Sequence, residues 1–240
     1  MKKVEKTANQ IVFTADISDT LANSVRRYVN RVLVLAVDEV EISRNDSPLY
    51  DEAIAHRISL VPLKSDKSVN EKSSEKLKLD VKKQGYVYSG EMKGGLEVAY
   101  KNIPITTLAE GQEIQLVAFA KAGKGAEHAK FSPGLMLYRS VSEITMDKEF
   151  HEEINKVFPN AEIKEKGNKI VIVDNKKNEM LDFCEGLAER KKKKAEVETK
   201  PELVVLVESF GQMPPEDIFK KSIDALRKDL ASIHKGVDKA

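Results

Sequence analysis

Apolar and polar residues alternate over residues 10–17, which predicts a half-buried β-strand near the start of the chain. The pattern then becomes helical, and Ser18 or Asp19 can cap a helix that begins near Thr20. The apolar residues of this helix have the spacing of a buried stripe: Leu21, Val25, Tyr28, Val29 and Val32. One face of the helix is therefore expected to pack on the protein core.

The opposite face of this helix carries amides and guanidiniums and no carboxylate. Its members are Asn23, Arg26, Arg27 and Asn30. Such groups form planar, multidentate hydrogen bonds. We therefore expect this face to contact another macromolecule, with a merely solvated face as the alternative.

The next segments predict a strand, a short helix and a loop. Apolar residues over 32–42 predict a second strand. A turn at 45–48 leads into a short helix through Ala53 that ends before Pro62. Residues 64–76 are rich in Lys, Ser and Glu, and they are expected to form a mobile loop.

The rest of the chain changes character near residue 148. Before it, short runs separated by turn residues predict strands at 77–81, 86–88, 96–100, 114–119 and 135–138. After it come a short helix, a strand, a second short helix, a charge run and a buried-type strand, at 148–158, 169–173, 180–188, 189–194 and 203–207.

A long amphipathic helix is predicted from about Pro214. Its large apolar residues are spaced 4, 3, 4 and 3 apart: Phe219, Ile223, Leu226, Leu230 and Ile233. We call these five residues the α-helical seam. Such a narrow heptad pattern is typical of docking between helices. A partner chain that shares the seam is one interpretation, and packing on the chain's own sheet is the other.

Composition indicates a globular protein with a highly charged surface. The 240 residues are 41% hydrophobic and 33% charged, with a formal net charge of +1, so the chain as a whole does not attract nucleic acid strongly. No apolar run reaches the length of about 18 residues that spans a membrane, and no apolar signal segment follows the charged start. The single cysteine fits a reducing compartment, and a cytoplasmic location is expected.

A search for catalytic motifs yields almost nothing. Phosphate-binding, dinucleotide-binding and His-Glu-x-x-His patterns are absent. His56 and His128 have no companion at ligand spacing, and His151-Glu152-Glu153 is better explained as a solvated helix start. Cys184 lies in an apolar segment, which favours a buried, inert thiol. No catalytic residue and no metal site are predicted.

Two lysine-rich stretches could touch phosphates. They are Lys191–Lys194 and the lysines around 64–83. Neighbouring glutamates dilute their charge and no aromatic residues are interleaved, so a flexible, solvated linker is the better interpretation of each. Little or no direct contact with DNA is expected.

Four motifs follow one another along the chain. They occupy residues 21–31, 50–63, 128–133 and 210–216. In this order the chain resembles the D subunit of archaeal DNA-directed RNA polymerase over nearly its whole length. That family is similar to the third-largest subunit of eukaryotic RNA polymerase II and to the amino-terminal domain of the bacterial alpha subunit.

The resemblance implies an α+β fold with a discontinuous dimerisation domain, a sheet plus helices, formed by residues 1–42 and 197–240. A mostly-β domain would be inserted at 43–147, and residues 148–196 would form a small ferredoxin-like remnant module. The sequence itself shows only the changes in composition at these places.

The resemblance also implies a function. The chain would be a non-catalytic assembly subunit of DNA-directed RNA polymerase that pairs with subunit L. The pair would form a platform for the second-largest catalytic subunit and the small subunits N and P. The active-site magnesium and the nucleotide chemistry would belong to the large subunits.

Particular residues match the motifs of the family. Asn23, Arg26 and Arg27 are expected to contact the large subunit. Asp51, Glu52, His56 and Arg57 are expected to form a second contact or a structural ion-pair network. The α-helical seam, from Phe219 to Ile233, is expected to form the interface with subunit L.

The chain departs from the family in one respect. Many members of the family carry cysteines for an iron–sulfur cluster in the ferredoxin-like module. A [4Fe–4S] cluster needs four ligands, whereas Cys184 is the only cysteine here, so we expect no cluster and no cofactor.

Two rival functions remain open at this stage. One is an independent enzyme that uses His128 or Cys184, although neither has convergent polar neighbours in the sequence. The other is a homodimeric transcription regulator, or another interaction protein, which the arginine-bearing helix face and the α-helical seam would allow.

Overall fold

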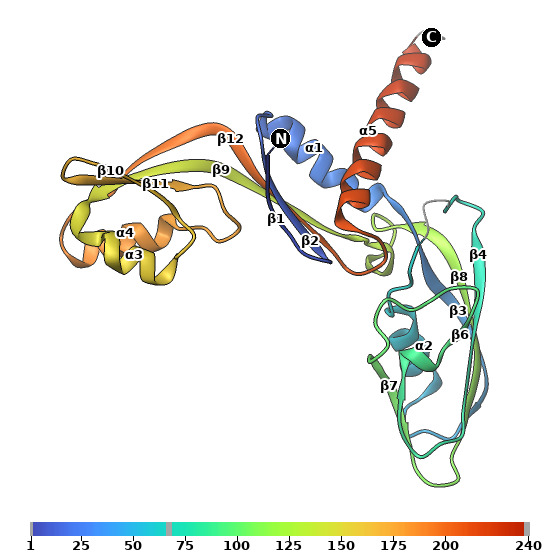
Figure 1. Ribbon diagram of the computed structural model, residues 1–240. Coiled ribbons are helices and arrows are strands. Elements are labelled where there is room, and N and C mark those ends of the chain that lie inside the picture. Colours follow the sequence, from blue (N-terminus) through green and yellow to red (C-terminus); the bar gives the residue numbers. More distant parts are fainter. Residues whose placement is uncertain (1, 66–68, 238–240) are drawn as a thin grey trace. The chain divides into compact units, whose positions relative to one another are not determined.

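The computed structural model describes residues 2–65 and 69–237, with side chains up to residue 233 at the C-terminal end. The chain divides into two compact units, each built from two separate segments. The first combines Met1–Ser24 with Met136–Val207, and the second combines Val25–Leu135 with Glu208–Ala240. The segments can be located in Figure 1 by colour, since its colour bar gives the residue numbers. The three predicted domains and their boundaries stay a prediction.

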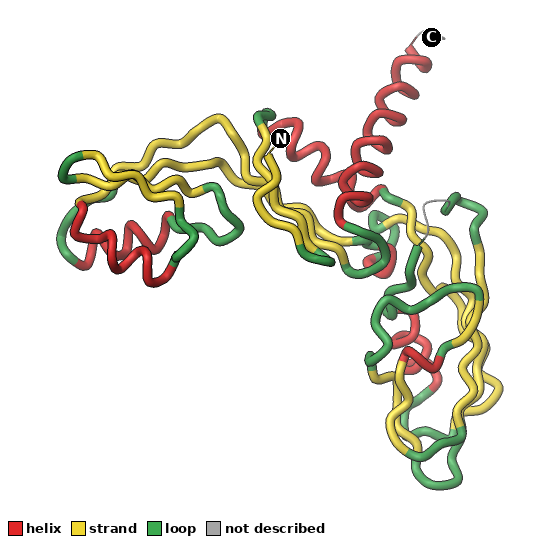
Figure 2. The backbone as a smooth tube through the Cα atoms, in the orientation of Figure 1, coloured by secondary structure: helices red, strands yellow, loops and turns green. Residues whose placement is uncertain are grey.

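A six-stranded sheet runs through the first unit, in the order β1-β2-β12-β9-β11-β10 (Figure 2). Its strands are β1 (Lys2–Lys6), β2 (Gln10–Ala15), β9 (Gly134–Asp147), β10 (Glu162–Lys166), β11 (Lys169–Asp174) and β12 (Glu196–Ser209). Strand β2 was predicted to be half-buried, which is wrong, because Val12, Phe13, Thr14 and Ala15 are all buried. It lies between β1 and β12, and both of its faces are covered.

Two short helices pack with one end of this sheet. They are α3 (His151–Val157), preceded by the 3-10 turn η4 (Lys148–Phe150), and α4 (Leu181–Arg190). Their core includes Ile144 and Met146 of β9 together with Ile154 and Cys184 of the helices. A fully buried carboxylate, Asp174, accepts hydrogen bonds from Arg139 Nη2 at 2.7 Å and from Met180 N at 3.1 Å. Because both of its oxygens are paired, this charge can be buried without being left unsatisfied.

The lysine run at 191–194 forms the end of α4. Lys192 has a left-handed backbone, with φ of 55°. Its N–H donates to Glu189 O at 2.8 Å, and Lys193 N donates to Ala188 O at 2.9 Å, which is the Schellman pattern of a helix C-terminus. The ammonium groups of Lys191 and Lys193 lie 4.8 and 5.8 Å from the centre of the buried Phe150 ring. The run is exposed, as the interpretation expected, but it forms the end of a helix, so the linker part of that interpretation is wrong.

The second unit contains a four-stranded sheet and a two-stranded sheet. The first has the order β3-β8-β4-β6 and the second pairs β5 with β7. Their bounds are β3 (Leu33–Asn45), β8 (Ile114–Lys124), β4 (Ser74–Val81), β6 (Lys93–Gly94), β5 (Gly85–Tyr88) and β7 (Pro104–Leu108). Helix α2 (Asp51–Ser59) contributes Ile54 and Ile58 to the large apolar core that these strands share.

Two predictions for this unit need correction. Residues 96–100 form no strand, and Val98 makes only an isolated bridge with Leu63. The predicted loop at 64–76 is too long, because Ser74 already belongs to β4, while residues 66–68 lie outside the described part of the chain. The mobility expected for this loop therefore stays a prediction.

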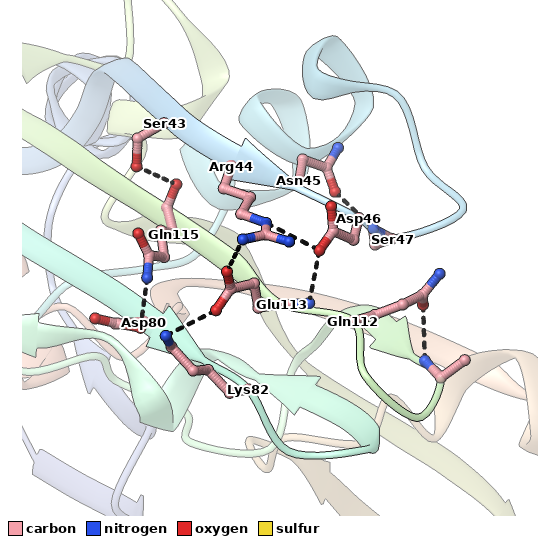
Figure 3. A network of polar contacts seen from close by, with 11 residues as sticks. Ser43, Arg44, Asn45, Asp46, Ser47, Asp80, Lys82, Gln112, Glu113 and Gln115 are labelled. Atoms are coloured by element: carbon pink, nitrogen blue, oxygen red, sulfur yellow. Dashed lines mark hydrogen bonds and ion pairs between the residues drawn. The ribbon is translucent and has the colours of Figure 1, made fainter.

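A polar network holds one end of the four-stranded sheet together (Figure 3). Arg44, near the end of β3, donates from Nε to Asp46 Oδ2 at 3.1 Å and pairs with Glu113. Lys82, directly after β4, lies 2.8 Å from the other oxygen of Glu113. Solvent screens both ion pairs, because Arg44 and Lys82 are 53% and 66% exposed, but both cations bind the one Glu113 side chain, which is only 14% exposed. Three segments far apart in sequence are thereby joined.

Asp38 occupies a bulge in β3, where the register with β8 shifts between Val37 and Glu39. Its carboxylate lies 2.6 Å from Lys121 Nζ and 2.7 Å from Lys130 Nζ. Hydrogen bonds from these two lysines lower the pKa of Asp38. The bulge thus ties β3 both to β8 and to the 3-10 turn η3 (Ala129–Phe131), which carries Lys130.

The remaining helical elements are α1 (Asp19–Tyr28), the 3-10 turn η1 (Val29–Arg31), the 3-10 turn η2 (Ser89–Glu91) and α5 (Pro215–Val237). No helix in the described part of the chain is long and apolar enough to cross a membrane.

Replacing Asp38 with Asn should give a pH-dependent loss of stability. The folded-state pKa of Asp38 lies below its unfolded value, so its ion pairs stabilise the fold above the ordinary carboxyl pKa of about 4. That stabilisation is lost as pH falls through the lowered pKa. We expect Asp38→Asn to cost about 1 kcal/mol at pH 7 in urea unfolding. The difference from the parent protein should shrink toward pH 2, and a difference that stays constant over this range would contradict the account.

Candidate assembly surfaces

The buried stripe that begins in α1 and continues past η1 matches the predicted one at Val25, Val29 and Val32 and differs from it at its start. Ala22, Val25, Val29 and Val32 are all at most 4% exposed, whereas Leu21 is 47% exposed. The inclusion of Leu21 in the buried stripe was therefore wrong. A small residue, Ala22, occupies the buried position at the start of the stripe.

The predicted polar face of this helix divides into two parts. Arg26 and Arg27 are exposed and Asn23 is half-buried, so their guanidinium and amide groups are displayed at the surface. Asn30 lies beyond α1 in η1, and its Oδ1 accepts a hydrogen bond from Ser132 Oγ at 3.0 Å. Asn30 is thus bound within the unit, and the contact predicted for Asn23, Arg26 and Arg27 stays a prediction.

Tyr28, predicted to belong to the buried stripe, is half-buried and links α1 to α5. Its hydroxyl donates to Asp229 Oδ2 at 3.0 Å, and this carboxylate raises the pKa of Tyr28. The contact spans 201 residues of sequence within one compact unit. It fixes one side of α5 against the end of α1.

The second motif forms α2, and its polar residues make separate contacts. Asp51 Oδ1 accepts a hydrogen bond from Asn45 Nδ2 at 2.7 Å, and Arg57 Nη1 donates to Ile105 O at 2.9 Å. Glu52 and His56 are exposed. Among the described residues, no ion pair joins these four side chains, so the ion-pair network that we considered for them is not formed. Asp51 and Arg57 hold α2 in place, while Glu52 and His56 are displayed.

The third and fourth motifs meet in one hydrogen-bonded junction. Phe210 N donates to Pro133 O at 3.0 Å, and Gln212 Nε2 donates to Ser132 O at 3.0 Å. Ser65 N in turn donates to Gln212 O at 2.8 Å. The sequence offers no signal that pairs residue 132 with residue 212, because each motif resembles an ordinary loop on its own.

The junction also sets the start of α5. Gly211 has φ of 99°, a conformation that favours glycine, and an added Cβ would lie 2.9 Å from the Tyr100 ring. Ser209 Oγ donates to Met213 O at 2.5 Å and accepts from Gly211 N at 3.0 Å. The Gly211 conformation and the hydrogen bonds of Ser209 therefore stabilise the turn that precedes the helix, which begins at Pro215.

Helix α5 packs most closely through residues outside the α-helical seam, and the first part of the seam is itself partly covered by the chain. Ile218 and Ser222, one turn apart, are completely buried. Within the seam, Phe219, Ile223 and Leu226 are half-buried. Leu230 and Ile233 are 58% and 63% exposed. The second half of the seam therefore presents large apolar side chains to solvent.

The residues considered for chemistry have structural roles. His128 Nδ1 accepts a hydrogen bond from Lys130 N at 3.1 Å and caps η3. Cys184 is fully buried, and burial raises the pKa of its thiol to about 12. Within the described residues, no group of three or more His, Cys, Asp and Glu side chains is placed to hold a metal ion.

A polar hollow of about 510 Å³ lies beside α5. Both signs of charge line it, with Arg31, Lys221 and Lys228 beside Glu71 and Asp224. At its edge Lys124 lies 3.3 Å from Glu71. Apolar and charged residues are mixed in its lining, whereas an ordinary substrate site is mostly apolar with a few converging polar groups.

Comparison with known proteins identifies the family. Residues 40–137 match the family model of the RNA polymerase Rpb3/RpoA insert domain, which overlaps the predicted β-rich insertion. The chain is similar to DNA-directed RNA polymerase subunit Rpo3 of Thermococcus kodakarensis, with 33% identity over 99% of this chain and 98% of that protein. The Rpo3 subunit of Pyrococcus horikoshii is 32% identical, over 95% of this chain and 93% of its own length.

A third Rpo3 subunit is similar to the chain over the same extent. The Rpo3 subunit of Methanothermobacter thermautotrophicus is 29% identical over 93% of both chains. The similarity to the Thermococcus kodakarensis protein covers 99% of the chain and so extends through both compact units. The chain therefore belongs to the family of the archaeal DNA-directed RNA polymerase subunit Rpo3, also called the D subunit.

Proposed function

We propose that this chain is a non-catalytic assembly subunit of a DNA-directed RNA polymerase, that it pairs with subunit L, and that it acts in the cytoplasm. One observation carries the proposal: α5 exposes Leu230 and Ile233 at 58% and 63% beyond the part of the helix that its own unit buries. Isolated helical turns are marginal in water, and large exposed apolar residues on one stripe favour burial by a partner helix. Subunit L is the partner that the resemblance to the family implies.

The other proposed partners are also assigned to side chains that the chain exposes. The exposed guanidiniums of Arg26 and Arg27, with Asn23 beside them, suit bidentate hydrogen bonds to the second-largest catalytic subunit. Glu52 and His56, displayed on an α2 that Arg57 and Asp51 hold in place, form a second candidate contact with it. Subunits N and P would join the same platform. The homodimeric regulator is the alternative.

The residues of the ferredoxin-like module do not fit an iron–sulfur cluster. Four ligands are required, and the one cysteine of the chain is fully buried with its thiol pKa raised to about 12, opposite to the thiolate that iron needs. We propose that the module is cluster-free in this protein. Iron and acid-labile sulfide assays on anaerobically purified chain should find neither, and about four irons per chain would overturn this point.

Pairing through the α-helical seam is tested by replacing Leu226 and Leu230 with Asp. Each change places a charge where the partner would bury an aliphatic side chain, so we expect affinity for subunit L to fall about 100-fold or more. The parent chain, co-expressed with subunit L, should elute as a 1:1 complex by light scattering. Lys228→Asp, on the opposite side of the helix, should leave the complex intact.

Two results would contradict this part of the proposal. One is a parent chain that stays monomeric or homodimeric in the presence of subunit L. The other is an Asp variant that binds subunit L as well as Lys228→Asp does. Thermal melts of each variant alone separate lost pairing from lost folding.

The large-subunit contact is tested by reversing charge at Arg26 and Arg27. The double Glu variant should still pair with subunit L but bind the second-largest subunit at least 10-fold more weakly, since two charge-assisted contacts become repulsive. Reversing the exposed Lys164 and Lys166 of β10 is the matched control. Equal binding by the two double variants would remove Arg26 and Arg27 from the interface.

A further inference from the structure

The two flanks of the α-helical seam differ. On one flank Ser222 is completely buried and Asp229 accepts the hydrogen bond from Tyr28, so that flank faces the chain's own unit. On the other flank lie Lys220 and Arg227, two turns apart and both exposed. Only this second flank is open to an approaching helix.

Across the described side chains, the positive charges on the open flank are also not balanced by carboxylates of the same chain. Asp224 is four residues from Lys220 and three from Arg227, the spacings at which helical ion pairs form. Even so, within the part of the chain that the structure describes, no carboxylate lies within ion-pairing distance of either cation. The open flank therefore presents two positive charges directly beside Ile223 and Leu230 of the seam.

We infer that the partner of α5 is an amphipathic helix that bears carboxylates on the flank facing Lys220 and Arg227. The inference rests on the proposed pairing and specifies the chemistry of the partner. Residues that flank an apolar seam determine partner choice and orientation through opposite charges.

The same flank disfavours a second copy of this chain as the partner. In an antiparallel pair of α5 helices, equivalent flanks face each other, and Lys220 and Arg227 would meet like charges. In a parallel pair, the open flank would have to meet the flank that Ser222 and Asp229 direct toward their own unit. Because both self-pairings are unfavourable, we expect the partner of α5 to be a different chain.

The test measures affinity of the full chain for subunit L at low and high salt. Reversing both cations, Lys220→Glu with Arg227→Glu, should weaken binding about 10-fold or more in 50 mM salt, and the loss should shrink in 500 mM salt. Lys228→Glu, on the opposite side of α5, is the control and should change affinity less than about 2-fold.

The outcomes separate this inference from the proposal on which it rests. If the parent chain does not bind subunit L at all, the proposed function fails. If the parent chain binds and the double reversal matches Lys228→Glu, the pairing stands and the acidic flank is overturned. Self-association of the parent chain through α5, seen by light scattering, would also overturn it.

Discussion

The hydrogen bonds between residues 132–133 and 210–212 determine where α5 begins. Phe210 N and Gln212 Nε2 donate to the carbonyls of Pro133 and Ser132, and Gln212 O accepts from Ser65 N. Gln212 is only 5% exposed, so loss of a partner would leave buried polar groups unsatisfied, at a cost of about 1–3 kcal/mol each. The start of the helix, and with it the direction of the seam, depends on these bonds.

Beyond this start, one stripe of α5 contacts the chain's own unit and another stripe carries the seam. Ile218 and Ser222 are buried in the chain's own unit, and Tyr28 holds the helix further along through Asp229. The seam lies to one side of these contacts and ends in the exposed Leu230 and Ile233. The first turns of the helix, anchored in this way, are preorganised for a partner.

The long, strongly periodic elements could be predicted from sequence. The helix at α1, strand β3 and helix α5 were all expected, because each has a clear apolar period. Strands β1 and β10 were missed, since Lys2–Lys6 and Glu162–Lys166 are charged edge strands with little apolar signal. Strand β7 was missed because it has only five residues and begins with Pro104, a residue that argues against a strand.

The candidate surfaces could be predicted only in part. The apolar spacing of the seam revealed α5, but nothing in the sequence showed that Ile218 and Ser222 take the inner side. Leu21 was placed in the wrong stripe because Ala22, a small residue, gives a weaker apolar signal than its neighbour. The role of Lys192 depends on a left-handed backbone conformation, which the lysine run does not reveal.

The most direct test of the central claim is amide hydrogen exchange across α5. If subunit L covers the exposed end of the seam, amides of residues 226–233 should exchange readily in the chain alone and become protected in the complex, while those near Ile218 should be protected in both. Equal exchange of residues 226–233 with and without subunit L would contradict the account.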